Sequence, residues 1–159
     1  MKNHGPLVGL IVLGLEAMVF DIETAFLMGD LDKKIYMKCP EGMIHEENEH
    51  LLLMKTIYGL VQASRIYYKK YAGMMKDLGF ERCKSDPCLF MKNDHNGLCY
   101  ILTYVDDNLV VGTRKALDQL LIDLKKTEFT FTVEHNLTDY LSCEIIREGN
   151  KAWLGQPHI

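Results

Sequence analysis

Residues 98–112 read LCYILTYVDDNLVVG, and this stretch carries the strongest indication of the fold. Two apolar runs flank the polar triplet Asp106, Asp107 and Asn108. Short apolar runs bounded by turn residues are typical of buried strands, and Asp and Asn are favoured in turns. We therefore predict a hairpin of two buried strands with the acidic residues at its tip.

Other segments have the length and composition of short strands. They are residues 17–23, 35–38, 51–55, 87–92, 140–146 and 152–154. A polar, acidic loop over 41–50 joins the second and third of them, and the turn residues NDHNG at 93–97 follow the fourth. Most of these strands follow one another without an intervening helix, which indicates antiparallel pairing.

Two helices are predicted from apolar residues at steps of three and four. The apolar face of the first consists of Tyr67, Tyr71, Met74, Met75 and Leu78. Gly79 stands at its expected C-cap. The second runs from Thr113, a suitable N-cap, to Glu128, and its apolar stripe consists of Leu117, Leu120, Leu121 and Leu124. The fold class is therefore α+β, a mostly antiparallel sheet with helices on one face.

The composition is that of an ordinary globular protein. The 159 residues are 48% apolar and 25% charged, which excludes a collagen, a coiled coil, a disordered tail and a small cysteine scaffold. The 18 basic and 22 acidic residues give a net charge of −4. Bulk charge therefore gives no argument for nucleic-acid binding, and any such partner has to be argued from a site.

The cysteines and the N-terminus predict an intracellular protein without a membrane partner. The five cysteines are odd in number and form no C-x-x-C motif, which favours reduced, buried thiols. Residues 7–20 are largely apolar but contain Glu16 and are too short to span a bilayer. A buried helix or strand is preferred there to a signal peptide headed by Lys2. His45 and His50 flank an acidic run, but a spacing of five favours a solvated loop over a metal site.

The acids that stand apart from the solvated surface are Asp21, Asp106 and Asp107. Asp21 follows the apolar residues 18–20, and the other two lie between apolar runs. Acids in buried strands are costly unless they pair, become neutral or bind a metal. We predict that the sheet brings Asp21 within a few ångströms of Asp106, where the carboxylates would suit Mg²⁺ and phosphoryl transfer with two ions. The alternative is that Asp-Asp-Asn is turn chemistry without a function.

The chain resembles the reverse transcriptase domain of Ty1/copia-type LTR retrotransposons. The matching stretches, in order, are FDIETAFLMGDLDKKIYMKCPEGM at 20–43, LLLMKTIYGLVQASRIYYKKY at 51–71, GFERCKSDPCLF at 79–90, YVDDNLVVG at 104–112 and a weaker DYLSCEI…LGQPHI at 139–159. The resemblance implies a truncated, polymerase palm-like domain over 17–159, with incomplete fingers and thumb. Residues 1–16 do not resemble the family well, and Leu141-Ser142 stands where the family usually has Leu-Gly.

The resemblance also implies roles for individual residues. Asp21, Asp106 and Asp107 match the catalytic, metal-binding aspartates, and Phe26 matches the aromatic steric gate that excludes a 2′-hydroxyl. Tyr104 would lie near the primer end. The residues that match the template-binding segment are Gly59, Gln62 and Arg65. A later basic motif of the family corresponds to either Lys125 or Lys126, and the sequence leaves that choice open.

The cofactor and partners that the resemblance implies are those of a retroelement polymerase. They are Mg²⁺, with Mn²⁺ as an alternative, an RNA template, a DNA primer, deoxynucleoside triphosphates, and the remainder of a Pol polyprotein with its integrase and ribonuclease H. The location would be intracellular, in cytoplasmic virus-like particles or the nucleus. A catalytically inactive remnant that folds or binds nucleic acid is the alternative. A third alternative is a different two-metal palm enzyme, such as a cyclase, and the YGL-x-Q-x-x-R stretch argues against it.

Overall fold

The computed structural model describes residues 15–31, 33–134, 139–140, 143–148 and 151–155. The contacts divide the chain into two compact units. We call Thr24–Tyr71 the ribbon unit, and the residues on both sides of it the sheet unit.

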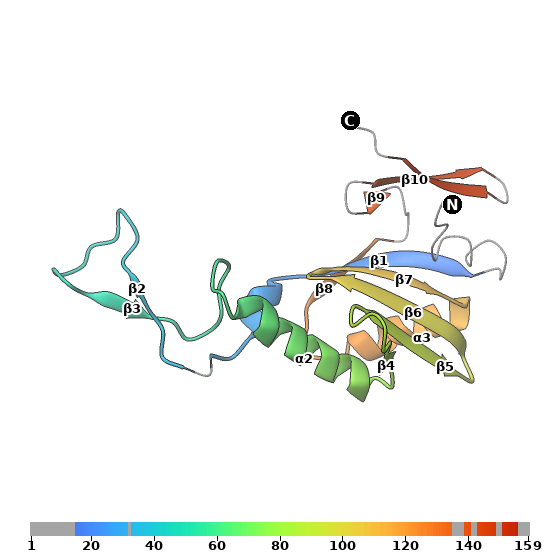
Figure 1. Cartoon of the computed structure of the whole chain (residues 1–159), viewed down its shortest axis with the longest axis horizontal. Coiled ribbons are helices and arrows are strands. Elements are labelled where there is room, and N and C mark those ends of the chain that lie inside the picture. The colour runs from blue at the N-terminus through green and yellow to red at the C-terminus, as the bar shows by residue number, and fades with distance from the viewer. Residues whose placement is uncertain (1–14, 32, 135–138, 141–142, 149–150, 156–159) are drawn as a thin grey trace. The chain divides into compact units, whose positions relative to one another are not determined.

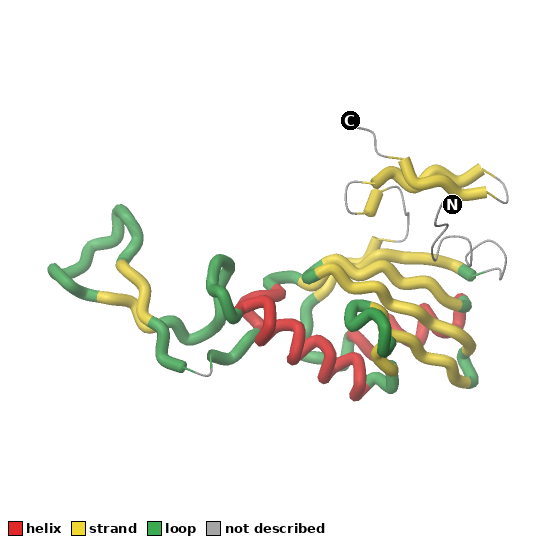
Figure 2. Tube along the Cα trace, in the orientation of Figure 1, coloured by secondary structure: helices red, strands yellow, loops and turns green. Residues whose placement is uncertain are grey.

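A six-stranded antiparallel sheet forms the centre of the sheet unit (Figure 1). Its strand order is β4-β5-β6-β7-β1-β8. The strands are β1 (Glu16–Ile22), β4 (Glu81–Arg82), β5 (Leu89–Asp94), β6 (Gly97–Tyr104), β7 (Asp107–Gly112) and β8 (Phe131–Glu134). The predicted hairpin is β6–β7, and its two-residue turn is Val105–Asp106. The N-terminal strand β1 lies beside β7, so the sheet joins segments from distant parts of the sequence (Figure 2).

The two faces of this sheet differ in what covers them. Met18, Phe20, Ile101 and Val110 lie on one face and are almost completely buried. Helix α3 (Arg114–Leu124) packs on β6 and β7. The opposite face carries an apolar cluster built on Leu15, Val19, Leu109 and Val111. Successive residues of a strand alternate between faces. Asp21 on β1 and Asp107 on β7 therefore lie on the same face as this cluster, next to Val19 and Leu109.

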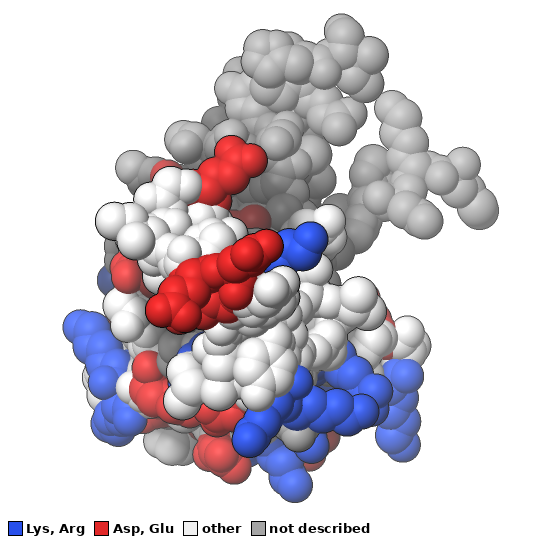
Figure 3. All heavy atoms as spheres, turned by 90° about the vertical axis from the view of Figure 1, so that its left-hand side faces the viewer, with Lys and Arg blue, Asp and Glu red and all other residues white. Residues whose placement is uncertain are grey.

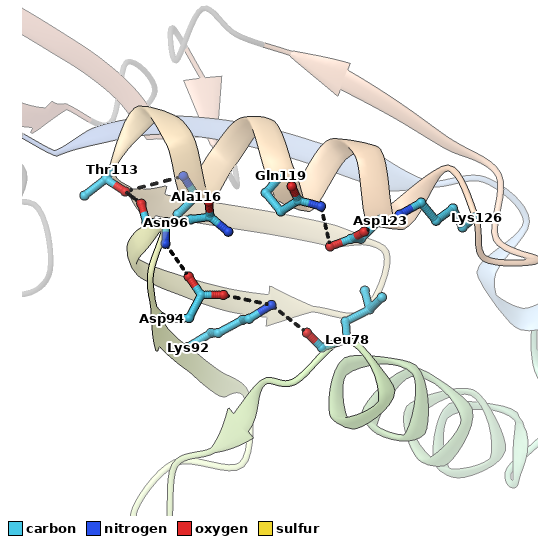
Figure 4. Close-up of polar contacts among 9 residues, drawn as sticks. All are labelled: Leu78, Lys92, Asp94, Asn96, Thr113, Ala116, Gln119, Asp123 and Lys126. Carbon is cyan, nitrogen blue, oxygen red and sulfur yellow. Dashed lines mark hydrogen bonds and ion pairs between the residues drawn. The ribbon is translucent and has the colours of Figure 1, made fainter.

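The helix ends are fixed by polar contacts, several of which are drawn in Figure 4. Helix α2 (Ala63–Asp77) is followed by Gly79 at φ +83°, as predicted for its C-cap. Lys92 Nζ donates to the Leu78 carbonyl at 2.9 Å. Thr113 Oγ1 accepts the Ala116 amide at 3.4 Å, which confirms the predicted N-cap of α3. This helix ends at Leu124 and not at the predicted Glu128, and the Thr127 hydroxyl donates to the Leu124 carbonyl at 2.7 Å.

The ribbon unit contains a 3-10 helix and a short antiparallel ribbon. They are η1 (Ala25–Met28), β2 (Tyr36–Lys38) and β3 (His50–Leu52). The first part of α2 also belongs to this unit. The exposed large apolar residues include Tyr36, Ile44, Met54 and Val61. Figure 3 shows one face of the molecule, with uncharged surface between acidic and basic side chains.

A separate three-stranded antiparallel sheet is built from the last described residues. Its strands are β9 (Asp139–Tyr140), β10 (Cys143–Glu148) and β11 (Lys151–Gly155), in the order β11-β10-β9. The predicted strands over 140–146 and 152–154 correspond to them. The departure at Leu141-Ser142 and most of the segment 1–16 lie outside the described residues.

The predicted α+β class, mainly antiparallel with two helices, is confirmed. Strands β4 and β8 were not predicted, because each is short and gains its hydrogen bonds from a distant segment. Among the described cysteines, Cys39, Cys83, Cys88 and Cys99 are free. Of these four cysteines only Cys99 is buried, so the prediction of buried thiols is wrong for the other three. Burial raises the pKa of the Cys99 thiol to about 12. In the described part of the chain, no helix is long and apolar enough to cross a membrane.

Gly112 provides a test of the sheet packing. A Cβ at this position would lie 2.6 Å from the Leu98 carbonyl oxygen, a backbone atom that cannot turn away. We expect Gly112→Ala to lower the free energy of unfolding by about 1–3 kcal/mol, as overpacked cores do. Gly73→Ala on α2 is the matched control, because no atom lies within 4 Å of its new Cβ, and it should stabilise by about 0.5–1 kcal/mol. Chemical denaturation of both variants measures the difference, and equal effects would contradict the packing of β6 on β7.

Candidate active site

Asp21 and Asp107 are direct neighbours across the β1–β7 ladder. The Ile22 amide donates to the Asp106 carbonyl at 3.0 Å, so the two aspartates form a pair that is not hydrogen-bonded to each other. Pairs of this kind have the closer side chains in an antiparallel sheet, with Cα atoms about 4.5 Å apart. The fold therefore places two carboxylates side by side on one face, at the end of an apolar row.

Four strands contribute to the row that contains these two residues. Tyr104 on β6 is opposite Asp107, and Thr132 on β8 is opposite Asp21. Tyr104 is 62% exposed, and the Thr132 hydroxyl donates to Glu23 at 3.0 Å. No prediction from the sequence includes Thr132, because β8 is short and gains its hydrogen bonds from the distant strand β1. Its alternation with apolar residues in FTVE is the signal that could have indicated a strand.

Asp106 occupies the turn between β6 and β7. Val105, which precedes it, has φ +58°, a conformation that β-branched residues rarely adopt. The side-chain amide nitrogen Nδ2 of the buried Asn108 donates to the Asp106 carbonyl at 2.6 Å and to the Phe20 carbonyl at 3.3 Å. Asn108 thus joins the turn to β1, a role that the sequence analysis did not assign to it. The feature of the sequence that could have indicated this role is a polar side chain, Asn108, followed directly by the apolar residues 109–111.

Burial and mutual repulsion disfavour the ionisation of the carboxyl groups of the site, so two of them have raised pKa values. Burial raises the pKa of the Asp21 carboxyl above its ordinary value, and the negative charges of Asp106, Asp107 and Glu23 raise it further. Burial also raises the pKa of Asp107, and the charge of Asp106 adds to this rise. Like charges directly opposite in a sheet are destabilising. A cation bound between the two carboxylates would relieve this repulsion.

The donor set fits a hard divalent cation. Mg²⁺ is usually held by one or two carboxylates, together with substrate phosphates and waters, and the pair Asp21 and Asp107 supplies two carboxylates on one face. Within the described ranges, no group of three or more His, Cys, Asp or Glu side chains is close enough to hold a metal ion by itself. His45 lies in the exposed loop predicted for it, whereas His50 is exposed but is the first residue of β3. The prediction that Asp21, Asp106 and Asp107 are metal ligands remains a prediction.

The remaining predicted residues lie in the ribbon unit. Phe26 is on η1, and its ring meets the rings of Tyr58 and Tyr67 edge-on, with centroids 4.5 and 6.0 Å away. Gly59 has φ +90°, which suits glycine. Gln62 immediately precedes α2 and Arg65 is exposed in its first turn.

The contacts of Lys125 and Lys126 in the sheet unit do not show which of the two corresponds to the family's basic residue. Lys125 is the C-cap residue of α3, and Lys126 forms an ion pair with Asp123 at 2.8 Å.

Comparison with known proteins identifies the family. A profile described as reverse transcriptase (RNA-dependent DNA polymerase) matches residues 12–158. The chain is 39% identical over 150 residues to the retrovirus-related Pol polyprotein from transposon TNT 1-94 of Nicotiana tabacum, covering 91% of the chain and 11% of that protein. It is 32% identical over 129 residues to the Pol polyprotein from transposon RE2 of Arabidopsis thaliana, covering 80% of the chain and 9% of that protein.

A shorter relative matches as well. The putative transposon Ty5-1 protein of Saccharomyces cerevisiae is 34% identical over 109 residues, which cover 67% of the chain and 35% of that protein. The chain spans about a tenth of the length of the two plant polyproteins. The matched profile covers nearly the whole chain, so this protein belongs to the reverse transcriptase (RNA-dependent DNA polymerase) family, in the form found in the Pol polyproteins of Ty1/copia-type retrotransposons.

Proposed function

We propose that the chain is the catalytic, palm-like part of an RNA-directed DNA polymerase, with residues 17–159 as the palm-like domain. The reaction is attack of a primer 3′-hydroxyl oxygen on the α-phosphorus of a deoxynucleoside triphosphate, with pyrophosphate as the leaving group. The observation that supports this role best is the pair Asp21 and Asp107, two acids with raised pKa opposite each other on one sheet face.

The chain's own residues would position the reactants. Asp21, Asp106 and Asp107 would hold the divalent cations, Mg²⁺ or Mn²⁺, which when bound lower the pKa of the attacking hydroxyl and neutralise charge on the phosphates. Tyr104, exposed next to Asp107 in the row, would lie near the primer end. Phe26 would occupy the volume that a 2′-hydroxyl needs. Gly59, Gln62 and Arg65 would contact the template.

The partners follow from the same proposal. They are an RNA template, a DNA primer, deoxynucleoside triphosphates and the other parts of a Pol polyprotein, including integrase and ribonuclease H. We place the protein inside the cell, in cytoplasmic virus-like particles or the nucleus. Because the matched region is about a tenth of the plant polyproteins, much of the surface that grips these substrates would come from outside this chain.

The experiment is primer extension on an RNA template with Mg²⁺ or Mn²⁺. The chain alone should extend the primer poorly, because positioning supplies a large share of catalysis in phosphoryl transfer. A hybrid in which residues 12–158 replace the matching stretch of the tobacco polyprotein should extend it, provided the parent polyprotein does.

The Asp106→Asn variant is the inactive control, both for the chain alone and for the hybrid. Synthesis by the hybrid that disappears in the inactive control would support the proposal. A folded hybrid that is inactive beside an active parent would favour the inactive remnant. Processive synthesis by the chain alone would show that the positioning argument is wrong.

A further inference from the structure

The 3-10 helix that carries Phe26 rests on one buried hydroxyl. Thr56 is fully buried. Its hydroxyl donates to the Phe26 carbonyl oxygen, and the Gly29 carbonyl oxygen lies 3.3 Å away as a second acceptor. The Thr56 amide also donates to the Gly29 carbonyl at 3.1 Å. A single residue, 30 positions further along the chain, therefore joins the beginning and the end of this short turn.

The contact between Thr56 and the turn leaves no free space. A Cβ on Gly29 would lie 2.5 Å from Thr56 Oγ1 and 2.7 Å from Ile66 Cγ2. Only a residue without a side chain lets the turn approach the threonine this closely. The backbone at Gly29 therefore lies directly against the Thr56 side chain.

The Phe26 ring is held separately from its backbone. The Tyr58 ring stands at 80° to it with a centroid distance of 4.5 Å, and the buried Tyr67 ring stands at 62° at 6.0 Å. Edge-to-face contacts of this kind favour one ring orientation. Tyr58 is two residues beyond Thr56, so the same segment anchors both the backbone and the ring of Phe26.

We propose that Thr56 is a positioning residue for sugar selection: it holds the Phe26 ring at the height where it excludes a 2′-hydroxyl. This inference rests on the proposed function of Phe26 as the gate. Exclusion by volume depends on placement within about 0.5 Å, the tolerance typical of functional sites. A ring on a loosened turn yields to the extra hydroxyl, so ribonucleotides are accepted more readily.

Two substitutions separate the hydroxyl from the shape of Thr56. Thr56→Val keeps the branched volume and loses the donor, whereas Thr56→Ser keeps the donor. In the active hybrid, the preference for deoxynucleotides, taken as a ratio of kcat/KM values, should fall about tenfold in the valine variant, because small misplacements have large kinetic effects. The serine variant should retain most of the preference. If Thr56 only supports the fold, its substitution would change kcat/KM for deoxy- and ribonucleotides by the same factor, and the ratio would stay constant.

A second readout needs no activity. The chain has six phenylalanines, so fluorine NMR of the chain labelled with 4-fluorophenylalanine gives a small spectrum, in which Phe26→Leu identifies the resonance of Phe26. Thr56→Val should shift or broaden this resonance, and Thr56→Ser should not. If the valine variant does not fold, Thr56→Ala replaces it, because it also removes the donor but places no methyl group against the Phe26 and Gly29 carbonyl oxygens.

The outcomes distinguish this inference from the proposed function. If Phe26→Val leaves sugar preference unchanged, the gate assignment is wrong, whatever Thr56 does. If Phe26→Val lowers the preference but Thr56→Val changes neither the preference nor the fluorine resonance, Thr56 is not a positioning residue. A fall in preference with Thr56→Val, restored with Thr56→Ser and accompanied by the resonance change, would establish the role.

Discussion

Replacing Asp21 by asparagine is expected to stabilise the metal-free chain and to lower primer extension by the hybrid polymerase about a thousandfold or more. The loss follows because bound cations stabilise transition-state charge by several kcal/mol, and the amide removes one of two neighbouring carboxylates that would hold them. The gain in stability follows from removing a like charge opposite Asp107, worth about 0.2–1 kcal/mol. The melting temperature should therefore rise by about 1–4 °C.

The stability gained by Asp21→Asn should decrease as the pH falls. The folded chain raises the pKa of Asp21 above its ordinary value of 3.8, so the ionised carboxylate destabilises the fold at neutral pH. As the pH falls through the raised pKa toward 3.8, the wild-type carboxyl takes up its proton in the folded state first, and the destabilisation disappears. The difference in unfolding free energy between Asp21→Asn and wild type should thus be largest near neutrality and vanish below the ordinary value.

Glu23→Gln is the matched control for this experiment. Glu23 follows Asp21 by two residues and also carries negative charge toward it, but it is not a predicted ligand. Its replacement should stabilise slightly, because it relieves repulsion, and should retain most of the primer extension. Thermal melts with and without Mn²⁺ complete the test, because the cation should stabilise wild type far more than Asp21→Asn. An Asp21→Asn variant that melts lower than wild type without metal would contradict the repulsion argument.

Phe26→Val should lower the preference for deoxynucleotides about a hundredfold while polymerisation continues. The ring is half-buried on η1 between two tyrosine rings, and a smaller side chain leaves room for a hydroxyl at C2′. Discrimination by a clash is worth a few kcal/mol, which corresponds to a change of about this size. The measurement is the ratio of kcat/KM values for a matched pair of deoxy- and ribonucleoside triphosphates in the hybrid polymerase.

Phe90→Val separates the gate from general effects of a lost ring. Phe90 is 1% exposed in the core of the sheet unit, so its truncation should destabilise the fold without changing the sugar ratio. If both variants change the ratio equally, or if Phe26→Val leaves it unchanged, Phe26 is a packing residue of the ribbon unit. Apparent loss of all synthesis in Phe26→Val alone would likewise contradict a purely steric role, because a gate is not needed for the chemistry.

Local patterns determined the elements that carry most of the site. The run that contains Asp106 and Asp107 formed the predicted hairpin, the segment before Asp21 formed the predicted strand, and the two helices appeared where apolar residues recur at steps of three and four. Periodicity of this kind is set within a few residues by the geometry of the backbone. The motifs between residues 20 and 159, in their order, were sufficient to indicate the family.

Long-range pairing decided the rest. The register of β1 on β7 placed Asp107, and not Asp106, opposite Asp21, and no local pattern specifies which residues of two distant strands meet. Strand β8 forms its ladder with β1, and Thr56 meets Phe26 across 30 positions. Hydrogen bonds and burial between distant segments exist only once the sheet and the turns are assembled. The aspartates could therefore be recognised from the amino-acid sequence, whereas their pairing and the support of the gate depend on the folded chain.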